Sequence, residues 1–126
     1  EEIVPRDPYP HEELVQELRR ILCNMRSTAS ISDDTDQFYV EAAGYSPMEQ
    51  IMEENSRAFR RAEVISQELV RIGPPAADAV AFGLRLQGRW REYLVPYVRA
   101  HGTNRIVSDA VHLVRKRKND PLRESI

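Results

Sequence analysis

The chain has 126 residues, of which 41% are hydrophobic and 30% are charged, and its formal net charge at pH 7 is -2. This length predicts one domain, because it supplies enough residues for one core and too few for two. No apolar run reaches the roughly 20 residues that a membrane-spanning helix needs, so we expect no membrane partner.

A single cysteine, Cys23, excludes an intramolecular disulfide and favours a reducing compartment. The apolar spacing around Cys23 predicts a buried thiol. Because no secretory signal pattern is visible, we expect a cytoplasmic or nuclear protein. The sequence begins with Glu1 rather than Met, which we interpret as a piece of a larger or processed protein.

The charged residues fall into two blocks of opposite sign. Residues 27–56 contain seven acids and no Lys or Arg, whereas residues 57–118 contain thirteen basic residues and five acids. Such blocks indicate either a partner attracted by charge or pairing between the two blocks. The basic residues are mostly arginines, which suit bidentate contacts to carboxylates or phosphates.

The first third of the chain predicts one helix between two irregular segments. Residues 1–10 contain three prolines and are expected to form an extended arm. A helix then begins near His11 and ends near Arg26, with apolar residues at helical spacing. Residues 27–37 have the composition of an acidic loop, and we expect the apolar residues 38–40 to form a turn packed on the core.

The second helix has the clearest start. Ser46 is a typical N-cap residue, Pro47 suits the first helical position, and Glu49 stands where a capping box needs it. Apolar residues then recur at helical spacing until Gly73, a residue that suits the end of a helix. This pattern predicts a helix of about 26 residues, roughly 39 Å long.

Three more helices are predicted beyond Gly73. Residues 75–87 are rich in Ala, so their helix is expected to lie centrally and close to its neighbours. A fourth helix covers residues 90–101, with a kink at Pro96, and a fifth covers residues 104–118.

No segment alternates between apolar and polar residues with the period of two that a β-strand shows. About five helices over residues 11–118 therefore predict an all-α fold, arranged as an irregular bundle or a short α-solenoid. Residues 119–126 are expected to follow this single domain as a frayed tail.

Two stretches resemble known helical families. Residues 61–86, with Ile72-Gly73-Pro74-Pro75 between their two helices, resemble one HEAT-type repeat, which buries its apolar face by stacking on neighbouring repeats. Residues 97–118 are similar to the last two helices of the N-terminal helical domain of transcript-cleavage elongation factors. Both resemblances imply an interaction module rather than an enzyme. The second implies binding of short acidic-hydrophobic peptides through Arg99, Arg105 and Arg115.

One cluster has the residue types of a hydrolytic or metal site: Ser108, Asp109 and His112 lie within one helical turn. A nucleophile elbow, an oxyanion loop or a third ligand would have to accompany them, and the sequence shows none. We interpret the cluster as a solvated helix face. We therefore expect no enzymatic activity, no metal and no cofactor.

The basic block supplies the candidate binding residues. We predict a protein-interaction or scaffold module whose arginine-rich surface, beside an apolar groove, binds an acidic amphipathic segment of another protein. The chain's own residues 27–43 are an alternative occupant. Another alternative is a nucleic-acid-binding module that uses the same residues on phosphates. The predicted partner-binding residues are Arg85, Arg89, Arg91, Arg99, Arg105, Arg115 and Lys116.

Overall fold

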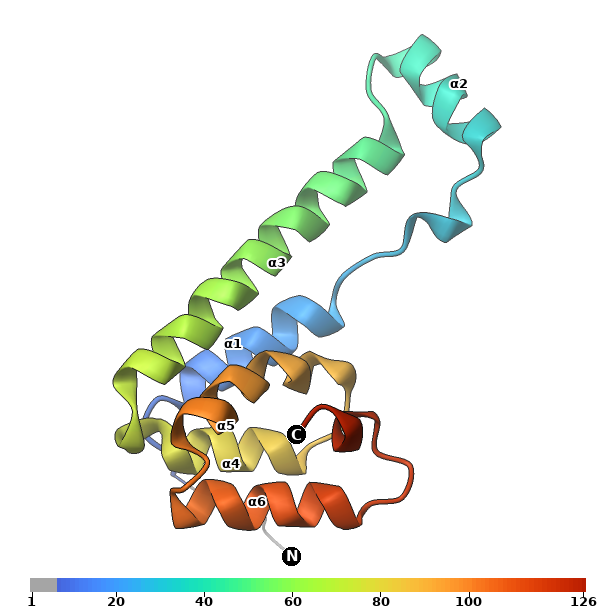
Figure 1. Ribbon diagram of the computed structural model, residues 1–126. Helices are drawn as coiled ribbons and strands as arrows, with labels where there is room; N and C mark the ends of the chain where they lie inside the picture. Colours follow the sequence, from blue (N-terminus) through green and yellow to red (C-terminus); the bar gives the residue numbers. More distant parts are fainter. Residues whose placement is uncertain (1–6) are drawn as a thin grey trace, which may run out of the picture.

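This computed structural model describes residues 7–126, which contain six α-helices and four short 3-10 helices (Figure 1). Residue 30 is described by its backbone alone. No β-strand occurs within the described residues, and the all-α prediction is confirmed. Residues 1–6 of the predicted extended arm lie outside the described part.

The α-helices are α1 (Glu12–Cys23), α2 (Asp33–Ala43), α3 (Pro47–Ile72), α4 (Ala77–Arg85), α5 (Val95–His101) and α6 (Arg105–Lys116). The 3-10 helices are η1 (Thr28–Ser30), η2 (Pro74–Ala76), η3 (Arg89–Leu94) and η4 (Pro121–Glu124).

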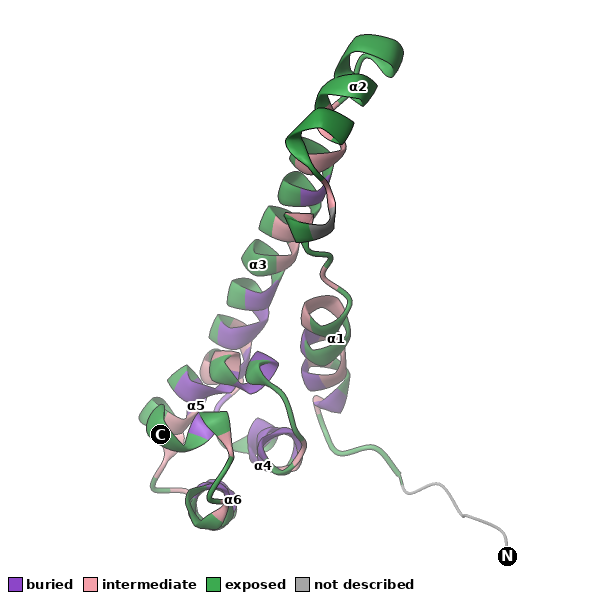
Figure 2. Cartoon of the chain, turned by 90° about the vertical axis from the view of Figure 1, so that its right-hand side faces the viewer, coloured by how far each residue is buried: buried purple, intermediate pink, exposed green. Residues whose placement is uncertain are grey.

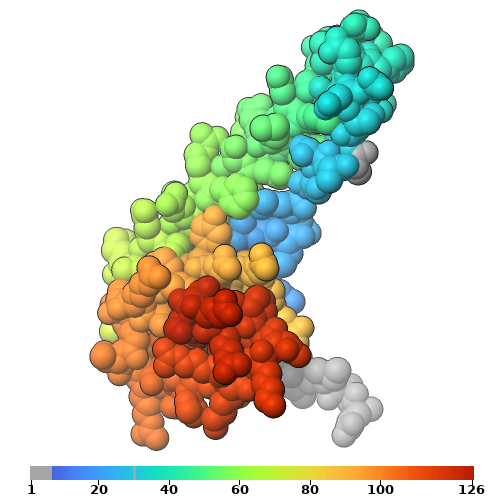
Figure 3. All heavy atoms as spheres, turned by 45° about the vertical axis from the view of Figure 1, so that its right-hand side comes forward, coloured from blue at the N-terminus to red at the C-terminus, as the bar shows by residue number. Residues whose placement is uncertain are grey.

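The helices form two parts, which we call the body and the arm. The body consists of α1, the second half of α3, α4, α5, α6, η3 and η4, and it holds the hydrophobic core. The arm, residues 33–60, consists of α2 and the first half of α3, and it extends away from the body (Figures 1 and 3). Ile51 is the arm's only buried residue, so packing contributes little to the arm (Figure 2).

α4 lies at the centre of the body, packed against α1, α6 and η3. The predicted close approach is present at Gly83, because a Cβ built there would lie 2.8 Å from Val15 Cγ1 and 3.0 Å from Leu94 Cδ1. Only a glycine lets these side chains come so near to the helix axis. The small residues of α4 therefore determine how closely the body packs.

The junction between α3 and α4 is held by two side chains of α5. Gly73 ends α3 with a φ of 74°, as the sequence predicts. The buried hydroxyl of Tyr97 donates a hydrogen bond of 2.6 Å to the Gly73 carbonyl, and His101 Nε2 lies 2.9 Å from the Val70 carbonyl. These contacts satisfy carbonyls that the end of a helix leaves without a partner.

The start of α3 is confirmed at Ser46, whose hydroxyl accepts a 3.1 Å hydrogen bond from the backbone N–H of Glu49. The carboxylate of Asp36 in α2 adds a second cap. It accepts hydrogen bonds from Ser46 Oγ at 2.8 Å and from the Met48 backbone N–H at 3.0 Å. Asp36 therefore joins α2 to the N-terminus of α3, where the helix dipole favours a negative charge.

The prediction of an acidic loop over residues 27–37 is wrong for its second half, which lies in α2. Ser32 caps this helix by accepting a 3.1 Å hydrogen bond from the Thr35 N–H, and Gly44 ends it with a φ of 77°. Acids in the first turn stabilise a helix, so their charge did not exclude one. The expectation that residues 38–40 pack on the core is also wrong, because all three side chains are exposed on the arm.

Two local expectations in the body need correction. Pro96 does not kink a continuous helix: residues 89–94 form η3, and Pro96 stands in the first turn of α5, where its missing N–H costs no hydrogen bond. Cys23 is exposed at the end of α1 rather than buried, since the core face of α1 is formed by Val15 and Leu18.

We expect Asp36→Ala to loosen the arm without unfolding the body. The change removes both hydrogen bonds from α2 to the start of α3, and loss of a helix cap costs about 0.5–2 kcal/mol. Hydrogen exchange should become faster in α2 and the first turns of α3 and remain unchanged in α4. Asp34→Ala, an exposed change in the same helix, is the control. Equal protection of α2 in the Asp36→Ala variant and the wild type would contradict this role.

Candidate functional site

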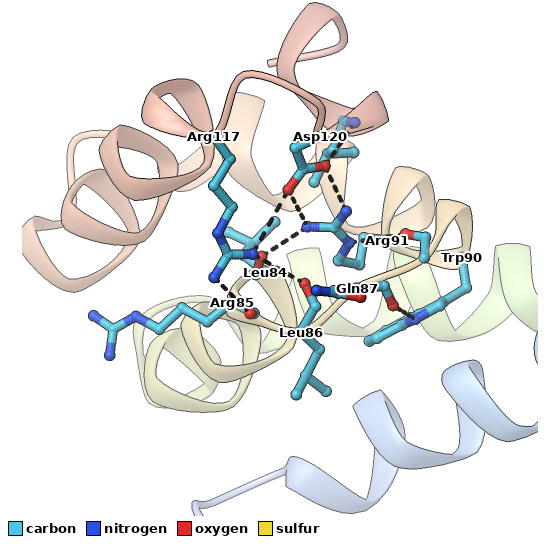
Figure 4. A network of polar contacts seen from close by, with 10 residues as sticks. Leu84, Arg85, Leu86, Gln87, Trp90, Arg91, Arg117 and Asp120 are labelled. Carbon is cyan, nitrogen blue, oxygen red and sulfur yellow. Dashed lines mark hydrogen bonds and ion pairs between the residues drawn. The ribbon is translucent and has the colours of Figure 1, made fainter.

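The C-terminal end of α4 is surrounded by charged side chains from two other segments, η3 and the stretch that follows α6 (Figure 4). Arg91 of η3 forms a bidentate pair with Asp120, with Nη2 2.6 Å from Oδ1 and Nη1 3.0 Å from Oδ2. The same guanidinium donates to the carbonyls of Leu84 at 3.0 Å and Gly88 at 2.8 Å. Both side chains of this pair are buried, with 1% and 5% of their surface exposed.

Arg117 adds a second cation to this helix end. Its guanidinium donates to the carbonyls of Arg85 at 3.0 Å and Leu86 at 3.3 Å, and it lies 3.6 Å from Asp120 Oδ2. Because helix C-terminal carbonyls carry partial negative charge, both arginines stabilise the end of α4. They also tie it to the segment that follows α6.

Asp120 holds the network together and organises the last residues. Hydrogen bonds from Arg91 lower the pKa of the Asp120 carboxyl, against the effect of burial, and the N–H of Leu122 contributes a further lowering. Oδ1 of Asp120 accepts that N–H at 3.0 Å and so caps η4, whose Leu122 is buried. The predicted frayed tail is therefore wrong for residues 120–122. Asp120 followed by Pro121 is a helix-start pattern that sequence reasoning missed.

The burial of Arg91 is the main correction to the predicted binding residues. The guanidinium donates four hydrogen bonds, two to Asp120 and two to backbone carbonyls, and only 1% of the side chain is exposed, so a partner cannot reach it. Arg91 is a structural residue. The prediction failed here because an arginine in a basic block looks the same in sequence whether it faces solvent or a distant carboxylate.

The other six predicted residues are exposed, and none forms an ion pair with a described residue. They do not form one cluster. Arg99 and Arg105 lie where α5 ends and α6 begins. The opposite end of the body, near the C-termini of α4 and α6, carries Arg85, Arg89, Arg115 and Lys116.

A depression of about 440 Å³ lies at this second end, and we call it the basic notch. Its lining includes Lys118 and Arg123, two exposed cations that sequence reasoning did not select, together with the predicted Arg89. An adjacent depression of about 340 Å³ is lined by Arg91, Arg117 and Asp120, whose charged groups are already paired. Of these two depressions, only the basic notch is lined by cations that form no ion pair with a described residue. The residues that line the notch are Arg89, Lys118, Asn119, Asp120, Pro121, Arg123 and Glu124.

Two exposed apolar side chains lie along α6 between the two basic ends. Ile106 and Leu113 are 41% and 39% exposed, and their spacing of seven residues places them on one line of the helix. Arg105 is next to Ile106 in the helix, and Lys116 lies one turn beyond Leu113. The exposed face of α6 thus carries two apolar side chains between two unpaired cations, with the exposed Asp109 between the apolar pair.

The chain's own acidic segment does not occupy this surface, so that alternative is wrong. α2 lies at the far end of the arm, where it packs against α3 (Figure 1). The separation leaves the positive surface of the body without an internal counter-charge from residues 33–43.

The described residues contain no group of three or more His, Cys, Asp and Glu side chains arranged to hold a metal. Ser108, Asp109 and His112 are all exposed on α6. Within residues 7–126, no helix combines the length and the apolar character that crossing a membrane requires.

Comparison with known proteins gives no further guide. No protein-family model matches the sequence. No significant match was found among curated proteins or among solved structures.

We expect Asp120→Ala to destabilise the body by about 3–5 kcal/mol, because it leaves the buried Arg91 without its counter-charge. Urea unfolding followed by circular dichroism measures the change. Glu68→Ala, which breaks an exposed ion pair with Arg71, is the control and should cost far less. Similar losses in the two variants would show that the Asp120 pair is not the stronger contact.

The lowered pKa of Asp120 also predicts a pH dependence. Because the folded-state pKa lies below the unfolded one, the ionised carboxylate stabilises the fold at neutral pH. This stability is lost as the pH falls through the acid range toward the folded-state pKa. Asp120→Asn should be less stable at neutral pH and should lose less stability on acidification. Parallel pH profiles of unfolding free energy for the two proteins would refute this linkage.

Proposed function

We propose that the chain is a cytoplasmic or nuclear protein-interaction module whose α6 face binds an acidic amphipathic segment. The observation that carries the proposal is the exposed apolar pair, Ile106 and Leu113, between Arg105 and Lys116. The two apolar residues lie about 10 Å apart along the helix, which equals two turns of an approaching helix. The resemblance of residues 97–118 to a peptide-binding helical domain supports the same function.

Apolar contact would supply most of the affinity and charge would supply orientation. A partner helix with apolar residues two turns apart covers Ile106 and Leu113 and removes their side chains from water. Its acids meet Arg105 and Lys116, which steer the encounter and fix its direction. The basic notch, with Arg89, Lys118 and Arg123, extends the positive surface beyond the C-terminus of α6.

The exposed apolar pair favours a protein partner over nucleic acid. Phosphate binding requires only cations and donors, so it leaves Ile106 and Leu113 without a role. Trp90 and Tyr97 are buried, which removes them as platforms for stacked bases. The nucleic-acid alternative therefore accounts for the cations alone.

A synthetic peptide tests the proposal. We expect a fluorescein-labelled amphipathic peptide, with leucines two turns apart and glutamates on the flanks, to bind the chain in an anisotropy titration. A scrambled peptide of the same composition should bind far more weakly. Leu113→Ser should weaken binding about tenfold, a loss of about 1.4 kcal/mol. Val64→Ser, which removes an exposed apolar side chain of α3 instead, is the matched control.

Salt dependence separates the two classes of partner. Phosphate binding by several cations predicts a steep linear fall of log affinity with log salt. The peptide complex should keep most of its affinity at high salt, and Leu113→Ser should weaken it by the same factor of about ten at low and high salt. If Leu113→Ser has no effect while a DNA duplex binds with a steep salt slope, the protein-partner proposal is wrong.

A further inference from the structure

The basic notch holds more positive charge than the segments around it neutralise. Arg89, Lys118 and Arg123 line it, all three are exposed, and none forms an ion pair with a described residue. Arg89 begins η3, Lys118 follows α6 and Arg123 lies in η4, so the fold brings the three together. Besides the paired Asp120, Glu124 is the one acid of the lining. Three free cations therefore surround the notch with one free acid.

The wall behind the notch is positive as well. The notch shares Asn119, Asp120 and Pro121 with the adjacent depression, which Arg91 and Arg117 also line. The single carboxylate of Asp120 lies 2.6 Å from the first arginine and 3.6 Å from the second. One negative charge thus faces two positive ones, and this group keeps a net positive charge. Like charges gathered in a concave site raise the local potential and attract anions.

We propose that the basic notch binds the phosphate group of a phosphorylated serine or threonine in the acidic partner segment, an inference that rests on the proposed function. A phosphate group carries nearly two negative charges and three acceptor oxygens, so it can form charge-assisted hydrogen bonds with all three free cations. A carboxylate carries one charge and two oxygens and would leave part of the positive charge unpaired. The volume of about 440 Å³ lies within the range of small-ligand sites and has room for the phosphate and the side chain that carries it.

The position of the notch indicates which end of the partner segment carries the phosphate. Lys116 is the last residue of α6 and Lys118 lines the notch, so the notch lies directly beyond the C-terminal end of α6. The negative end of the α6 dipole favours a partner helix whose positive N-terminus lies over it, which is the antiparallel arrangement. A phosphate is also stabilised at a helix N-terminus. The phosphorylated residue should therefore precede the first apolar residue of the partner helix.

Phosphorylation of the amphipathic test peptide measures the contribution of the notch. In the anisotropy titration, phosphoserine placed just before the first leucine should tighten binding to the wild type about tenfold, because it adds contacts to three cations. Glutamate at the same position should gain far less, since it carries one charge. Phosphoserine after the second leucine should gain little, because that end of an antiparallel partner lies away from the notch.

Substitution of the notch residues assigns the gain to this site. The double variant Lys118→Gln/Arg123→Gln should lose most of the phosphoserine gain and should affect the unphosphorylated peptide much less. Arg60→Gln/Arg99→Gln, which makes the same charge change at exposed sites elsewhere, is the matched control and should keep the gain. A gain that Lys118→Gln/Arg123→Gln leaves intact overturns the proposal, because a cation outside the notch would then supply it. So does a wild type that binds the phosphorylated and unphosphorylated peptides equally.

A second measurement does not depend on the apolar face of α6. A short glycine-rich peptide with one phosphoserine has no apolar side chain, and phosphorus NMR follows its phosphate signal directly. We expect a saturable shift with the wild type and none with Lys118→Gln/Arg123→Gln. A shift without Leu113-dependent binding of the amphipathic peptide would overturn the proposed function and support the phosphate site alone. An unshifted signal with the wild type overturns the phosphate site, whatever the amphipathic peptide does.

Discussion

A buried ion pair at the end of α4 is the constraint on which the body depends. Removing Arg91 and Asp120 from water is costly, and the guanidinium recovers this cost because it also donates to two backbone carbonyls. The pair fixes where the central helix ends and holds the residues after α6 against the core. Around it, the small residues of α4 let neighbouring elements pack closely, and a Cβ at Gly83 would press on Val15 and Leu94. The arm has no comparable buried anchor. Its helices are held by caps, by the carboxylate of Asp36, and by the contacts of Glu54 and Asn55 with Arg26.

Local signals in the sequence predicted the start and end of most helices. Ser46 and Gly73 bound α3, and the alanines of α4 predicted its central place, because caps, turns and small residues act within a few positions of the chain. α2 carried equally clear signals in Ser32 and Gly44. It was missed because its acids were interpreted as solvated loop residues, and because no apolar face demanded a helix there.

The candidate site was less predictable because it depends on contacts between distant residues. Arg91 and Asp120 are 29 positions apart, and nothing near either residue shows that they meet. Six of the seven predicted cations are exposed. Their division between the two ends of α6 could be seen only in the fold. The free cation Arg123 was overlooked, since residues 119–126 were expected to form a frayed tail, and Lys118, at the end of the fifth predicted helix, was not selected.

The order in which the ribosome delivers the chain gives the buried pair a further meaning. Arg91 emerges long before Asp120, and until then its guanidinium must remain hydrated and the carbonyls that end α4 must remain open to water. The helices can form in sequence, and the buried pair is completed only once residue 120 has left the exit tunnel. The last part of the body's stability is thus added by a residue that follows all six α-helices in the chain.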